Sequence, residues 1–155
     1  MSELFEAPVE YAAVTRGKFV FRVPMQGYLF NERHCWARVV GNRARVGLSD
    51  YLQQKLSDLT CCEPPPVGAE VEQGGGIGSV ESVKAVVEII SPVSGRVVAV
   101  NATVAAAPEL INEDPYGRGW IAEVQLRHPG SERALLLDGP GYLEFVRRKA
   151  AEHEG

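Results

Sequence analysis

Short apolar runs separated by glycine and proline turns fill most of this chain and constrain its fold more than any other feature. Period-two alternation within such runs is typical of β-strands with one buried face. In Arg43–Leu48, for example, Ala44, Val46 and Leu48 fall on one face and the two arginines on the other. Strands are expected at 19–23, 35–40, 43–48, 69–71, 77–80, 86–90, 96–101 and 120–126. Many short strands predict a mainly β fold, either a sandwich or a barrel.

Helices are expected only at the periphery of this fold. Ser49 or Asp50 can cap a helix over 50–59, in which leucines recur at helical spacing. Two further short helices are expected at 131–137 and 141–151, near the end of the chain. Residues 108–119, rich in proline, glycine and asparagine, are expected to form a loop.

The length of 155 residues fits one domain with attached tails. We expect an N-terminal extension over 1–27, the domain itself over 28–137, and a C-terminal helix and tail over 138–155. A net charge of −4 argues against a general nucleic-acid binder. The chain has no long apolar run and its acidic N-terminus does not resemble a signal peptide, so a cytoplasmic protein with no membrane partner is expected.

Lys84 stands out among the four lysines of the chain. It lies between two apolar strand-like runs, where a tight hairpin would expose it. An exposed lysine amine can be acylated, which removes its charge and creates a flexible arm on a rigid scaffold. The alternative is that Lys84 is merely a solvated charge.

Several ordered motifs bear on that choice. The run Gly78–Ala85, followed by Ser91–Gly95, resembles the lipoylation region of glycine-cleavage H proteins. Further similarity to that family is found in Arg33–Trp36, Ala44–Tyr51, Pro108–Gly117 and Gly119–Trp120. The resemblance covers about residues 27–148, and Lys84 matches the modified lysine of the motif.

The resemblance implies a flattened β-barrel sandwich, the barrel-sandwich hybrid of lipoyl domains, with small peripheral helices. It implies lipoic acid in amide linkage to Lys84, on a carrier that is not itself an enzyme. It also implies that a lipoylating enzyme reads the surroundings of Lys84, for which the candidates are Glu81, Ser82, Val83, Ala85 and Glu88. From the family's rough two-fold symmetry, the Ser94–Gly95 turn is expected close to the lysine hairpin.

The pathway stays open between two alternatives. In glycine cleavage, the arm would carry an aminomethyl group among glycine decarboxylase, aminomethyltransferase and dihydrolipoyl dehydrogenase. H-protein-like lipoate-binding proteins also carry sulfur intermediates for a heterodisulfide-reductase-like complex in sulfur oxidation. The N-terminal extension and the adjacent Cys61 and Cys62 depart from the usual H-protein pattern and keep this second pathway open.

Cys61 and Cys62 are candidate accessory thiols, although ordinary free thiols are the simpler interpretation. If their strand is regular, one side chain is buried and the other partly exposed. His34, His128 and His153 have no partner at catalytic or metal-ligand spacing, so neither a catalytic nor a metal site is expected. Two other classes remain as alternatives, an unmodified H-like interaction module and a biotinyl carrier.

Overall fold

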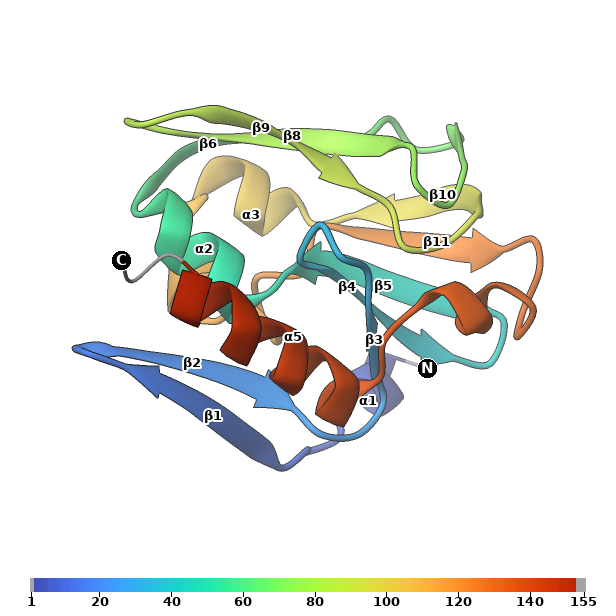
Figure 1. The fold of residues 1–155 in the computed structure, drawn as a ribbon. Helices are drawn as coiled ribbons and strands as arrows, with labels where there is room; N and C mark the ends of the chain where they lie inside the picture. The colour runs from blue at the N-terminus through green and yellow to red at the C-terminus, as the bar shows by residue number, and fades with distance from the viewer. Residues whose placement is uncertain (1, 153–155) are drawn as a thin grey trace.

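The computed structural model describes residues 2–152, so His153 and the end of the predicted C-terminal tail lie outside the described residues. Two antiparallel sheets form the body of the protein (Figure 1). The larger sheet has the strand order β3 (Tyr28–Phe30), β4 (Cys35–Val40), β5 (Arg43–Leu48), β11 (Ala122–Leu126), β10 (Gly95–Val100) and β7 (Glu70–Val71). The smaller sheet has the order β6 (Leu59–Glu63), β8 (Gly76–Ser82) and β9 (Val86–Ile90).

Side chains from both sheets meet in one apolar core. Val46 and Val124 come from the larger sheet, Ile77 and Ile89 from the smaller one, and each is almost fully buried. Alternation along each strand sends these residues inward and leaves polar neighbours outside. The mainly β prediction, with a barrel-sandwich architecture and small helices, is therefore confirmed.

Short helices lie around the sheets: α1 (Ser2–Phe5), α2 (Asp50–Leu56), α3 (Ala102–Ala106), α4 (Glu109–Glu113), the 3-10 helix η1 (Glu132–Leu135) and α5 (Gly139–Glu152). The expectation of a loop throughout 108–119 was wrong, since α4 forms there. The helix that begins at Asp50 is shorter than predicted. Ser57 has a φ of 66°, outside the helical region, and Leu59 already belongs to β6.

The segment before residue 28 packs against the body. It forms the hairpin of β1 (Tyr11–Arg16) and β2 (Phe19–Pro24), which lies beside α5 in Figure 1. Phe21 of β2 is buried in a second apolar cluster with Trp36, Tyr116 and Tyr142. Because this cluster contains residues from both ends of the chain, α5 and the β1–β2 hairpin stabilise one another. The domain boundaries at residues 27 and 137 stay a prediction.

Two hydrogen bonds from β2 fix the hairpin in place. The amide of Arg22 donates to the Asp50 carboxylate at 2.8 Å, and the carbonyl of Arg22 accepts from the Tyr116 hydroxyl at 2.7 Å. Asp50 and Tyr116 are both buried. The hairpin is thus positioned on the side of the protein where α2 begins.

Candidate functional site

Lys84 lies in the tight turn that joins β8 to β9. The hydroxyl of Ser82 accepts hydrogen bonds from the amides of Lys84 at 3.1 Å and Ala85 at 3.3 Å. The amide of Ser82 donates to the carbonyl of Ala85 at 2.9 Å and closes the turn. Ser82 itself is buried, so the turn is tied to the body of the sheet and its residues have little freedom to move.

The amine of Lys84 is exposed at this turn. Its Nζ donates one long hydrogen bond, of 3.4 Å, to the carbonyl of Lys55 at the end of α2. Within residues 2–152, no carboxylate forms an ion pair with it. Since acylation requires an accessible amine, this setting suits a covalent attachment site.

Four of the five residues predicted to be read around the attachment site are accessible. Glu81, Val83, Ala85 and Glu88 are all exposed, and Val83 keeps 84% of its surface accessible. Ser82 is buried, and any contribution it makes to recognition comes through the shape of the turn. Recognition of these residues by a lipoylating enzyme stays a prediction.

The adjacent cysteines lie on β6, the edge strand next to β8. Cys61 is paired in register with Glu81 and is partly exposed, whereas Cys62 is opposite Val80 and is buried. This is the alternation expected from a regular strand, and both thiols are free. Burial raises the pKa of the Cys62 thiol to about 11, so it stays protonated near neutrality. An accessory role for either thiol stays a prediction.

A cleft of about 480 Å³ opens beside the turn. It is lined by Lys55 and Tyr51 of α2, by Glu88 of β9 and by His34 from the loop before β4. Lys55 also contacts Lys84 through its carbonyl, so the cleft lies within reach of a group tethered there. The sequence analysis did not find this cleft, because its walls come from segments far apart in the chain.

His34 has an unusual backbone within the cleft wall. Its φ is 68°, a left-handed conformation that non-glycine residues seldom adopt. Its Nδ1 lies 2.7 Å from the hydroxyl of Tyr142, which donates to Ser49 Oγ at 2.8 Å. Burial raises the pKa of Tyr142 well above its usual value, so this hydroxyl stays neutral and available as a donor.

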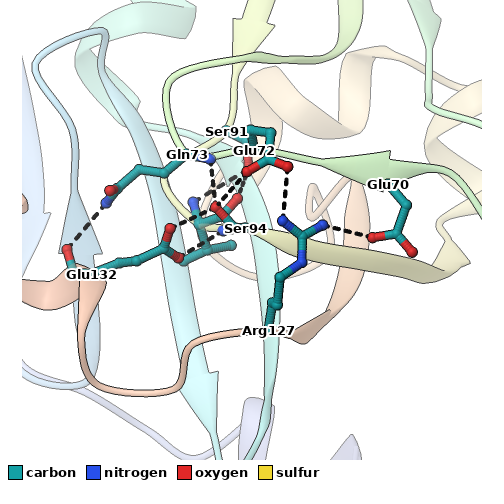
Figure 2. Close-up of polar contacts among 8 residues, drawn as sticks. Glu70, Glu72, Gln73, Ser91, Ser94, Arg127 and Glu132 are labelled. Carbon is teal, nitrogen blue, oxygen red and sulfur yellow. Dashed lines mark hydrogen bonds and ion pairs between the residues drawn. The ribbon is translucent and has the colours of Figure 1, made fainter.

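The Ser94–Gly95 turn lies at the opposite end of the smaller sheet, so the expectation that it sits near Lys84 was wrong. β9 leads away from the lysine turn, and the chain reaches Ser94 only after that strand ends. Figure 2 shows Ser94 accepting from the Gln73 amide at 2.8 Å and donating to the Glu132 carboxylate at 2.5 Å. This network joins two loops far from the attachment site.

The described part of the chain contains neither a cluster of metal ligands nor a membrane-spanning helix. No group of three or more histidine, cysteine or carboxylate side chains there could hold a metal ion. No helix there is long and apolar enough to cross a membrane.

The fold and site together define a carrier class: a β-scaffold that presents the accessible amine of Lys84 at the tip of a hairpin. Comparison with known proteins agrees. The family model described as glycine cleavage H-protein matches residues 28–149. The chain belongs to the glycine cleavage H-protein family, whose members are lipoyl carriers and not enzymes.

Individual relatives span several lineages. The chain is 46% identical over 127 residues to a glycine cleavage system H protein of Rubrobacter xylanophilus, which covers 82% of this chain and 95% of the relative. It is 40% identical over 131 residues to the mitochondrial glycine cleavage system H protein 2 of Arabidopsis thaliana. That match covers 84% of this chain and 83% of the relative. A crystal structure of an H protein from Mycobacterium marinum superposes with a TM-score of 0.70 at 32% identity, covering 77% of this chain and 96% of that one.

Proposed function

We propose that this protein carries lipoate in amide linkage on Lys84 and moves a bound intermediate between the enzymes of glycine cleavage. The observation that carries the proposal is the exposed Lys84 amine, which is held at a rigid turn and faces no carboxylate partner within residues 2–152. The partners would be a lipoylating enzyme, glycine decarboxylase, aminomethyltransferase and dihydrolipoyl dehydrogenase. The family of the chain supports these partners, and a cytoplasmic location stays a prediction.

The residues around Lys84 fit a covalently attached group. Bound lipoate would supply a disulfide that can be opened, loaded and closed again. The chain would supply a fixed origin for the arm, because the Ser82 hydroxyl accepts from the backbone amides of Lys84 and Ala85. A fixed origin raises the effective concentration of the carried group at each partner's active site.

The cleft beside the turn would shelter the end of the arm between transfers. Leu52 and Val87 give it an apolar part, whereas Glu32 and Glu88 give it two carboxylates. Arg33, Lys55 and Lys149 line the same cleft, so it offers both signs of charge to polar groups of the arm, and the apolar wall would contact its hydrocarbon part. The imidazole of His34, held by the Tyr142 hydroxyl, fixes one side of this cleft.

The alternatives find no support. The relatives named above are glycine cleavage H proteins, and none of them supports a role in sulfur oxidation. An unmodified interaction module and a biotinyl carrier would both give a protein without lipoate. The mass of the native protein therefore distinguishes both alternatives from a lipoyl carrier.

The test is a reconstituted glycine cleavage reaction in which this protein is the carrier. Lipoylated wild type should support NADH formation from glycine, whereas Lys84→Arg, which keeps the charge but cannot be lipoylated, should support none. Lys55→Arg serves as the control for a conservative change beside the site. Turnover by Lys84→Arg would contradict the proposal.

A further inference from the structure

All four lysines of this acidic chain gather on one side of the protein. Lys84 Nζ contacts the carbonyl of Lys55, and Lys55 Nζ lies 6.0 Å from the centre of the Phe19 ring. Lys18 Nζ lies 5.5 Å from the same ring, while Lys149 lines the cleft together with Lys55. In Figure 1 the tips of the β1–β2 and β8–β9 hairpins and the end of α5 all point to this side.

The tip of the β1–β2 hairpin adds apolar surface to these charges. Phe19 and Val20 keep 40% and 50% of their surface exposed, although the hairpin buries Phe21 next to them. Gln54 of α2 donates to the carbonyl of Val20 at 2.9 Å and ties the tip to the helix that carries Lys55. We name the surface of Lys18, Phe19, Val20 and Lys55 the lysine ledge. Its first three residues precede the region that the family model matches.

Lys55 shares the cleft with Glu32 and Glu88, but no carboxylate lies within ion-pair distance of the ledge lysines among residues 2–152. Lys149 is different, since the Glu152 carboxylate lies 3.7 Å from its Nζ. The ledge therefore presents two cations without an ion pair and two exposed apolar side chains beside the attachment site.

Geometry limits what can approach this surface. An enzyme that takes the end of a short arm into its active site must come within one arm length of Lys84. It must then cover the surface next to the turn, which includes the lysine ledge. Lysine charges on the rim of an interface attract an oppositely charged partner and speed its encounter without holding it long. This behaviour suits a carrier that has to leave each enzyme after transfer.

We propose that the lysine ledge docks the enzyme that loads the arm, through a carboxylate-rich rim around the pocket that receives it. The proposal rests on the proposed function, since it requires an arm on Lys84. Acylation of Lys84 removes one of the four lysine charges, and Lys55, whose carbonyl contacts Lys84 Nζ, remains as a cation beside the turn. Phe19 and Val20 would then be covered by apolar side chains of the enzyme.

Binding of the lipoylated protein to glycine decarboxylase from the same organism tests the proposal. Lys18→Glu should raise the dissociation constant roughly fivefold at low salt, because it replaces attraction by repulsion at an exposed rim. The matched control is Arg133→Glu, the same change of charge in η1 at the far end of the protein, where residue 133 is also exposed. The control should stay within about twofold of wild type.

Salt provides a second readout that a structural role would not change. The dissociation constant of wild type should rise with salt, and the values for wild type and Lys18→Glu should converge at high ionic strength as the charges are screened. Equal constants for wild type, Lys18→Glu and Arg133→Glu at low salt would overturn the docking proposal. A native protein without lipoate would instead overturn the proposed function, and the two failures are thus distinguishable.

Discussion

The hydroxyl of Ser82 holds the amide of Lys84 at 3.1 Å, so a buried side chain controls the backbone of the exposed residue that would carry the arm. The same oxygen accepts from Ala85 at 3.3 Å. Ser82 is thus the point at which the smaller sheet determines how the amine is presented.

Removal of this hydroxyl should loosen the turn. Ser82→Ala should lower the free energy of unfolding by about 1 kcal/mol, since it deletes the acceptor of two backbone amides. The lipoylation rate should fall, because the enzyme then meets a mobile turn. Urea denaturation measures the free energy of unfolding, and the rate at which the protein gains the mass of a lipoyl group measures lipoylation. Ser79→Ala, on the same strand, is the control, and an unchanged lipoylation rate in Ser82→Ala would contradict the role of the turn.

Tyr142→Phe should destabilise the protein by roughly 1–2 kcal/mol, because the buried hydroxyl bridges Ser49 and His34. The cleft wall at His34 should also become more mobile, since the imidazole of His34 loses its contact with this hydroxyl. Equilibrium unfolding in urea gives the free energy. Tyr11→Phe, at a residue that keeps 43% of its surface exposed, should change it little. A loss of unfolding free energy in Tyr11→Phe equal to that in Tyr142→Phe would refute this prediction.

The ion pairs at the far end predict a pH dependence. The Arg127 guanidinium, 2.7 Å from the Glu72 carboxylate, holds the pKa of Glu72 below its ordinary value of 4.5. A lowered pKa in the folded state means that the stabilising effect is present above the unfolded value and is lost as the pH falls through the folded one. The melting temperature of Glu72→Gln should thus lie below that of wild type at neutral pH, and the two should converge in acid.

The control for this series is Glu63→Gln, which removes an exposed carboxylate with no ion pair inside residues 2–152. The difference in melting temperature between Glu63→Gln and wild type should not change between neutral and acid pH. A constant gap between Glu72→Gln and wild type down to the acid range would argue against the Arg127–Glu72 pair as its cause.

The cysteines should react at different rates with a thiol reagent. Cys61 is partly exposed, whereas burial raises the pKa of Cys62 to about 11 and that of Cys35 to about 12. At about pH 8, one thiol of the folded protein should therefore react rapidly with Ellman's reagent, because thiolates are the reacting species. Cys61→Ser should abolish the fast phase. A fast phase that survives this substitution would place the reactive thiol elsewhere.

The sequence predicted the elements whose signal is local. The strands at 35–40, 43–48 and 86–90 were predicted with their observed bounds, because alternation and glycine turns mark them directly. β1 was missed, since Tyr11–Arg16 mixes exposed and buried positions without a clear pattern. α4 was missed because prolines and glycines bound it so closely that the whole stretch looked like a loop.

The site was predictable only at its centre. The motif located Lys84 and its neighbours, but the cleft depends on His34, Tyr51 and Glu88 meeting from three separate elements. The lysine ledge likewise depends on how the N-terminal hairpin packs against α2, which no local pattern encodes. Ser94 was misplaced because the symmetry argument ignored the direction in which β9 leaves the turn.

Intact mass after treatment with the host lipoylating enzyme tests the central claim most directly. Wild type and Lys55→Arg should each gain roughly 188 daltons, the mass of one amide-linked lipoyl group, while Lys84→Arg gains nothing. Peptide mapping of the wild type should place the added mass on residue 84. A lipoyl group on Lys84→Arg, or a wild type that gains no mass, would contradict the account.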